Sequence, residues 1–89
     1  MITRDLEITN KLGLHARAAA KLVHTAARFK SELKVRKGPE EVDAKSILGV
    51  LLLAAGKGST ITVTASGEDE AEAVATIEHL ISTKFDEVE

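Results

Sequence analysis

The chain has 89 residues, a formal net charge of −2, two phenylalanines and no tyrosine, tryptophan or cysteine. This length predicts a single domain over residues 1–89 that buries about 60% of the surface of the unfolded chain. The absence of cysteine excludes disulfides and thiolate metal sites. An acidic, aromatic-poor chain also lacks the basic surface and stacking platforms that nucleic acids require, so we expect no nucleic acid partner.

The N-terminal part predicts a strand, a loop and a helix. Apolar and polar residues alternate over residues 2–8, with Arg4 as the one break in the apolar face. Residues 10–14 predict a loop that contains Gly13, and residues 16–27 predict a helix. The apolar face of this helix is expected to comprise Ala19, Ala20, Val23 and Ala27.

The middle of the chain predicts a turn between two extended segments, followed by a short helix. Residues 32–36 alternate as a second strand, and Gly38-Pro39 marks a turn. Residues 40–44 are expected to be extended. Residues 46–55 then predict a short helix.

The C-terminal part predicts a strand followed by a helix. Gly56 and Gly58 are expected to end the preceding helix, and residues 60–65 show the clearest alternation in the chain. Gly67 then turns the chain into a helix over residues 68–83. The apolar side of this last helix is expected to comprise Val74, Ile77, Leu80 and Ile81.

The order of these elements predicts the fold class. Strand, helix, strand, strand, helix, strand, helix corresponds to βαββαβα, and no strand is a continuous apolar run. Alternating strands are typical of an antiparallel sheet with one polar face. We therefore expect an α+β open-faced sandwich, in which a four-stranded, mostly antiparallel sheet carries three helices on one face.

No stretch of the sequence has the apolar character expected of a signal peptide or of a membrane-spanning helix. The opening residues, MITRDLEIT, have no apolar stretch of the kind that signal peptides contain. The longest apolar run, residues 47–55, is far shorter than the roughly 20 residues that span a bilayer. We expect a cytoplasmic, monomeric protein with no direct membrane insertion.

The stretch NKLGLHARAAAKLV places His15 where the loop becomes a helix, with Arg17 two residues later. The N–H groups at a helix start, here those of Ala16, Arg17 and Ala18, bind phosphate together with the positive end of the helix dipole. The same positive end disfavours an imidazolium, so we expect a neutral, nucleophilic His15. Arg17 adds a planar cation that suits phosphate oxygens. The arrangement fits a histidine that carries a phosphoryl group itself.

Other roles for His15 are less well supported. The three histidines, His15, His24 and His79, show no metal-ligand spacing, so we expect no metal and no cofactor. Histidine is not among the preferred helix N-caps, and a turn beside Gly13 and Arg17 disfavours a core position. Spacing alone leaves the cap and the phosphoryl acceptor as alternatives.

A second motif begins at Ser46, a favoured N-cap residue, ahead of an apolar run. If Val50 and Leu53 face the sheet, then Ile47, Leu48 and Leu51 point away from it, because helical residues advance by about 100°. These three residues either sit under a loop or form an exposed patch that marks a partner site.

Both motifs together resemble one family. LGLHARAAAKLV, followed by KSILGVLLLAAGKGSTITVTASGEDE, is similar to HPr, the histidine phosphocarrier of the bacterial sugar phosphotransferase system, over essentially the whole chain. The resemblance implies that His15 accepts phosphate on Nδ1 from enzyme I, which phosphoenolpyruvate charges, and passes it to IIA-type acceptors. It implies an assisting role for Arg17. The family usually has proline where this chain has Ala18.

The resemblance also implies roles for the second motif. Ser46 corresponds to a regulatory phosphorylation site used by an HPr kinase/phosphorylase, and Ile47, Leu48 and Leu51 correspond to a partner-docking patch. The protein would then be a carrier with a transient phosphohistidine rather than a stand-alone catalyst. The alternatives are a regulatory binding module that acts mainly through Ser46 and docking, and a member of the nitrogen-related relay, which the opening EITNKLG and the ending KFDEVE resemble.

Overall fold

The computed structural model describes residues 1–86, which form a sheet of four strands and three α-helices. In chain order the elements are β1 (Ile2–Glu7), α1 (Ala16–Ala27), β2 (Glu32–Lys37), β3 (Glu40–Asp43), α2 (Ile47–Leu52), β4 (Thr60–Ser66), α3 (Glu70–Ser82) and the 3₁₀ turn η1 (Lys84–Asp86). The predicted βαββαβα order is confirmed, and η1 is an addition that the sequence patterns did not predict.

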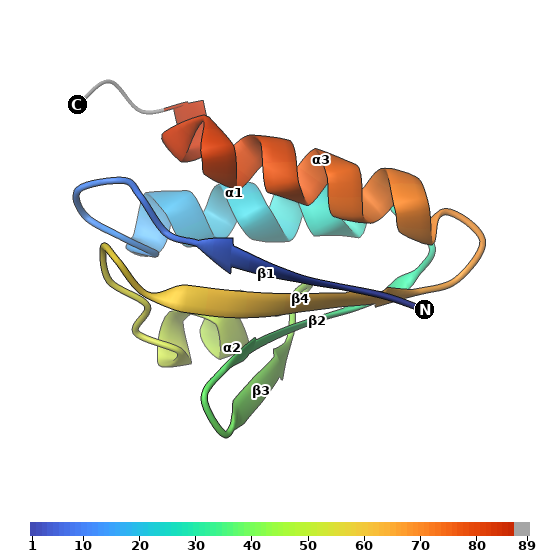
Figure 1. Ribbon diagram of the computed structural model, residues 1–89, viewed down its shortest axis with the longest axis horizontal. Helices are drawn as coiled ribbons and strands as arrows, with labels where there is room; N and C mark the ends of the chain where they lie inside the picture. Colours follow the sequence, from blue (N-terminus) through green and yellow to red (C-terminus); the bar gives the residue numbers. More distant parts are fainter. Residues whose placement is uncertain (87–89) are drawn as a thin grey trace.

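The sheet has the strand order β1-β4-β2-β3, and every neighbouring pair is antiparallel. Its register pairs Leu6 with Ile61 and Val35 with Val63, so apolar residues of adjacent strands share one face. Figure 1 shows α1 and α3 running side by side along the sheet. The α+β open-faced sandwich is therefore confirmed.

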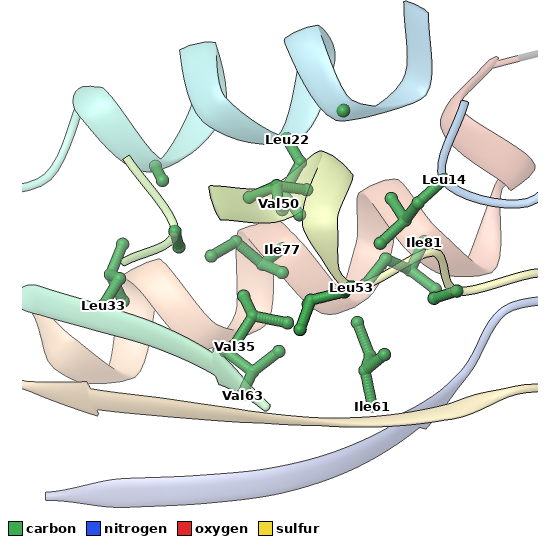
Figure 2. Packing of buried hydrophobic residues seen from close by; sticks show 14 of the residues in the cluster. Leu14, Leu22, Leu33, Val35, Val50, Leu53, Ile61, Val63, Ile77 and Ile81 are labelled. Atoms are coloured by element: carbon green, nitrogen blue, oxygen red, sulfur yellow. The ribbon is translucent and has the colours of Figure 1, made fainter. Parts of the chain in front are cut away.

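All three helices contribute to one hydrophobic core on the helical face of the sheet. Figure 2 shows Leu22 of α1, Val50 of α2 and Ile77 of α3 converging above Val35 and Val63 of the sheet. All five side chains are fully buried. The short helix α2 thus belongs to the same layer as the two longer helices, and the opposite face of the sheet stays polar.

The bounds of α1 were predicted correctly, but its buried face was not. The predicted face included Ala20, Val23 and Ala27, of which the first two are only half-buried and the last is exposed. The buried residues are Ala18, Ala19, Leu22 and Ala26. The alanine-rich sequence allows several helical stripes, and Leu22 decides among them because it carries the largest apolar side chain on the inward stripe.

The end of α2 was also predicted wrongly. The helix stops at Leu52, not at residue 55, and the two glycines do not end it. Ala54 ends it by adopting a left-handed conformation (φ 49°), which lets the Ala55 carbonyl accept the Leu14 N–H at 2.8 Å. A tertiary hydrogen bond therefore accompanies a conformation that alanine alone does not favour.

The C-terminal helix begins at Glu70, two residues later than predicted, and ends at Ser82. Beyond it, Lys84, Phe85 and Asp86 all have left-handed backbones, with φ values of 57–59°. The Phe85 side chain is fully buried, and its carbonyl accepts a hydrogen bond from Lys21 Nζ at 2.5 Å. This hydrogen bond and the buried phenylalanine hold η1 against α1.

The opposite end of the fold is fastened by Asp69, which precedes α3. Its carboxylate accepts hydrogen bonds from the Ser31 hydroxyl and from the N–H groups of Lys30 (2.8 Å) and Ser31 (2.9 Å). These donors, with the Ser31 hydroxyl having the largest effect, lower the pKa of Asp69 to about 2. Gly67 packs so closely here that a Cβ would lie 2.6 Å from Ser31 Oγ.

Candidate functional site

His15 is the N-cap residue of α1 and so lies where the loop becomes a helix, which is the position that the sequence predicted. Its backbone is extended (φ −73°, ψ 178°), and its carbonyl accepts the Ala19 N–H at 2.8 Å, the first bond of the helix. The imidazole does not cap the helix and is half-exposed. The side chain therefore projects from the helix start with one part accessible to a reactant.

The surroundings of His15 favour an anion. The N–H groups of Ala16, Arg17 and Ala18 lie in the first turn, where no intrahelical carbonyl can accept them. No acidic residue occupies that turn, and Arg17 is exposed. Free N–H groups, the positive helix end and a guanidinium thus coincide beside the imidazole, which is the combination that binds phosphate.

Gly13 and Leu14 fix the loop that carries His15. Gly13 has φ +67°, and a Cβ there would lie 2.5 Å from the Ala55 carbonyl oxygen and 2.7 Å from Gly56 Cα. Leu14 is buried, and its N–H donates to the same Ala55 carbonyl. The loop therefore rests directly on the segment after α2, and only glycine permits so close an approach.

Asn10 is a structural residue of this loop that the sequence patterns did not predict. Asn10 is fully buried. Its side-chain Nδ2 donates to the Gly13 carbonyl at 2.8 Å, and its backbone carbonyl accepts the Gly13 N–H at 3.2 Å. These bonds close a turn two residues before His15. An asparagine three residues ahead of a glycine was the available signal, because asparagine side chains commonly stabilise turns.

Ala18, which replaces the proline usual in the resembled family, serves both the site and the core. Its N–H belongs to the first helical turn, and its side chain is fully buried. The residue at position 18 is therefore constrained by packing in the core as well as by its place in the first turn of α1, beside His15.

Ser46 caps α2, as predicted. Its Oγ accepts the Gly49 N–H at 3.1 Å, and the residue is half-buried. The neighbouring Lys45 extends its Nζ to the Phe29 carbonyl, 2.8 Å away, just beyond the end of α1. The start of α2 is thus held in place by its own cap and by α1.

An exposed apolar surface covers the outer side of α2, and we call it the α2 patch: Ile47, Leu48, Leu51 and Leu52. Leu48 and Leu52 are 72% and 79% exposed, while Val50 and Leu53 are buried as predicted. The three predicted patch residues are all exposed, and Leu52 was missed. A leucine is compatible with either a buried or an exposed position. Only the rotational phase of α2 about its axis shows that Leu52 faces outward.

The α2 patch and His15 lie at the same end of the molecule. The chain leaves α2 and within three residues meets the histidine loop at the Ala55–Leu14 hydrogen bond. Leu12, in that loop, is also exposed. Figure 1 shows the start of α1 and the whole of α2 at this end. A partner that reaches His15 therefore encounters apolar surface beside it.

The other histidines are not brought to this site. His24 lies in the last turn of α1, about 13 Å along the helix axis from His15 at the usual rise per residue, and His79 lies in the last turn of α3. Within residues 1–86, no three His, Asp or Glu side chains are grouped so as to hold a metal ion. In the same range, no helix is long and apolar enough to cross a membrane.

Comparison with known proteins gives consistent matches along the chain. A family model described as the PTS HPr component phosphorylation site matches residues 2–83. The chain is 52% identical to the phosphocarrier protein HPr of Cupriavidus necator over 89 residues, which is all of both chains. It is 44% identical to the phosphocarrier protein NPr of Shewanella violacea, covering 97% of this chain and 94% of that one.

Solved structures give the same result. The HPr of Thermoanaerobacter tengcongensis superposes with a TM-score of 0.96 at 43% identity and full coverage of both chains. The catabolite repression protein Crh of Bacillus subtilis, described as a swapped dimer, has a TM-score of 0.75 at 38% identity, covering 94% of this chain and 97% of that one.

Proposed function

The chain belongs to the HPr family of phosphocarrier proteins of the phosphotransferase system, and on that basis we propose that it carries a phosphoryl group on His15. The donor is enzyme I charged by phosphoenolpyruvate, and the recipients are IIA-type proteins. The protein acts as a cytoplasmic carrier with a transient phosphohistidine and is not a stand-alone catalyst. It needs no metal or cofactor for this step.

The observation that carries the proposal is the position of His15 at the start of α1. A half-exposed imidazole there adjoins three N–H groups without intrahelical acceptors, an exposed guanidinium and no carboxylate in the first turn. This arrangement supports binding of a dianionic phosphoryl group without competition from a local negative charge.

The transfer is a displacement at phosphorus. The lone pair on Nδ1 of neutral His15 attacks the phosphorus, while the bond from phosphorus to the donor's leaving atom breaks and its electron pair stays with the donor. The His15 proton remains on Nε2. The N–H groups of Ala16 and Ala18 and the Arg17 guanidinium then stabilise the phosphoryl oxygens. Transfer to an acceptor repeats the displacement in the opposite direction.

Docking is the second requirement of a carrier, because donor and acceptor must each align with His15. We assign this role to the α2 patch, whose Ile47, Leu48 and Leu51 were expected to contact partners and whose Leu52 extends the same surface. Exposed apolar area of this kind is typical of protein interfaces. Monomeric carriers would present the patch to one partner at a time.

Ser46 offers a point of control on the same surface. A phosphoryl group on its Oγ, added by an HPr kinase/phosphorylase, would sit at the start of α2, where negative charge is favourable. It would also place about −1.5 to −2 charge at the edge of the α2 patch. We therefore expect phosphorylation of Ser46 to weaken docking and to leave the fold intact.

The experiment is phosphorylation by enzyme I and phosphoenolpyruvate. We expect one acid-labile phosphate per chain, lost in His15→Ala and retained in His24→Ala, which is the matched control on the same helix. Retention of the phosphate in His15→Ala would refute the proposal.

Two alternatives to this proposal are a regulatory binding module that acts mainly through Ser46 and the α2 patch, and a member of the nitrogen-related relay. Parallel assays with enzyme I and with the nitrogen-branch donor distinguish them: a binding module accepts phosphate from neither, and a relay member prefers the second donor.

A further inference from the structure

The peptide unit that joins Gly13 to Leu14 is held on two sides, one residue before His15. Its carbonyl accepts a hydrogen bond from Asn10 Nδ2 at 2.8 Å, and its N–H, which belongs to Leu14, donates to the Ala55 carbonyl at 2.8 Å. A peptide unit is planar, so hydrogen bonds at its carbonyl and at its N–H fix the orientation of the whole plane. The chain therefore enters His15 from a unit whose direction is set.

Gly13 is the residue at which this direction would otherwise vary. Its φ is +67°, and glycine adopts both left-handed and right-handed conformations at little steric cost. Asn10 binds both backbone groups of this glycine, because the Asn10 carbonyl also accepts the Gly13 N–H at 3.2 Å. The asparagine thus restricts the backbone on either side of the most permissive residue in the loop.

The burial of Asn10 strengthens this restriction. Asn10 has no exposed surface, so water is not at hand to replace the Gly13 carbonyl as the partner of Nδ2. A buried amide that loses its partner keeps the full cost of its desolvation. Loop conformations that break this bond are therefore disfavoured, and the buried side chain of Leu14 holds the next residue in the core.

The direction of the chain at this point matters for the chemistry of His15. Phosphoryl transfer needs the attacking and leaving atoms roughly in line with the phosphorus, and a misplacement of about 1 Å can cost roughly 100-fold in rate. His15 is the last residue before α1. A rotation of the Gly13–Leu14 peptide would therefore shift the imidazole relative to the first-turn N–H groups that receive the phosphoryl oxygens.

We propose that Asn10 is a positioning residue for phosphoryl transfer and acts on His15 through the Gly13–Leu14 peptide. Asn10 is fully buried and so offers no surface to a partner; its effect falls on the transfer step and not on docking at the α2 patch. This inference rests on the proposed function, because it takes His15 as the phosphoryl acceptor.

The test compares Asn10→Ala with Ser31→Ala. Ser31 is the matched control because it is also polar, is 1% exposed, and is hydrogen-bonded to Asp69 at the start of α3. The starts of α1 and α3 lie at opposite ends of the molecule (Figure 1). Truncation of either side chain therefore removes a buried hydrogen bond, but only the first lies in the histidine loop.

Phosphorylation by enzyme I and phosphoenolpyruvate is measured over a range of concentrations of each folded variant, which separates kcat from KM. We expect kcat to fall at least about tenfold in Asn10→Ala, with KM within about twofold of the wild-type value. Both constants should be unchanged in Ser31→Ala.

Amide hydrogen exchange gives a readout that does not involve enzyme I. Under conditions in which the variants are folded, the Leu14 N–H should exchange about two- to tenfold faster in Asn10→Ala, the factor for one hydrogen bond of ordinary net strength. It should keep the wild-type rate in Ser31→Ala. In the wild type, the Asn10 side-chain amide should exchange slowly, because it is buried and bonded to Gly13.

Equal kcat values in Asn10→Ala and Ser31→Ala would overturn the proposal, and so would a loss confined to KM. If Asn10→Ala does not fold, Asn10→Asp takes its place, since it keeps the shape of the side chain and lacks the Nδ2 donor. Fast exchange of the Asn10 amide in the wild type would overturn the proposal without any variant. Retention of the phosphate in His15→Ala would instead refute the proposed function, so the two failures are distinguishable.

Discussion

Replacing Gly13 with alanine tests how the histidine loop is held. A Cβ at this position would lie 2.5 Å from the Ala55 carbonyl oxygen and 2.7 Å from Gly56 Cα, both of them backbone atoms. Gly38 provides a matched control, since its φ of +59° is close to the +67° of Gly13 and nothing lies within 4 Å of an added Cβ. Both substitutions carry the cost of a left-handed alanine, about 1–2 kcal/mol. Both also reduce the conformational entropy of the unfolded chain by the same amount.

The two variants should therefore differ by the steric contact alone. Forcing extra atoms into packed surroundings costs about 1–3 kcal/mol, so Gly13→Ala should be less stable than Gly38→Ala by about that amount. For a domain of this size, the difference corresponds to a melting temperature at least about 4 °C lower.

Urea unfolding followed by circular dichroism measures this difference, because the chain has no tryptophan or tyrosine for fluorescence. We also expect slower phosphorylation by enzyme I in Gly13→Ala and an unchanged rate in Gly38→Ala, since a displaced loop moves His15. Equal stability in the two variants would refute the close contact between the loop and Ala55.

Three further predictions concern single side chains. Arg17→Ala should change the free energy of unfolding by less than about 0.5 kcal/mol, because Arg17 is exposed, yet should clearly slow phosphoryl transfer in a stopped-flow assay; an unchanged rate would mean that the helix start suffices. Ser46→Asp should weaken binding of enzyme I, measured by calorimetry, without lowering the melting temperature; a large fall in that temperature would contradict the capping geometry. Because the pKa of Asp69 is lowered from 3.8 to about 2, its carboxylate contributes stability that is complete above about pH 4 and is lost as the pH falls through 3.8 towards 2. The gap in melting temperature between wild type and Asp69→Asn should therefore close over that range, and a gap independent of pH would contradict the role of the Ser31 and Lys30 donors.

Local patterns predicted the features that local physics controls. The start of α1 at Ala16 and the cap at Ser46 follow from turn and capping preferences, and alternation of apolar residues was sufficient to locate β2 and β4. The exposure of Ile47, Leu48 and Leu51 followed from helical spacing once Val50 faced the sheet.

Tertiary contacts decided what these patterns missed. Alanine at position 54 gives no local sign of a left-handed backbone, and the Ala55–Leu14 hydrogen bond is visible only in the fold. The inward stripe of α1 depended on packing around Leu22, which a run of alanines does not reveal.

In the proposed function, the start of α1 holds a phosphoryl group on His15. NMR of the protein phosphorylated by enzyme I tests it most directly, with long-range ¹H–¹⁵N correlations for the imidazoles and amide shifts for the backbone. We predict phosphate on Nδ1 of His15, with the largest amide changes at Ala16, Arg17 and Ala18. Phosphate on His24 or His79, or unchanged amides over residues 16–18, would contradict the claim.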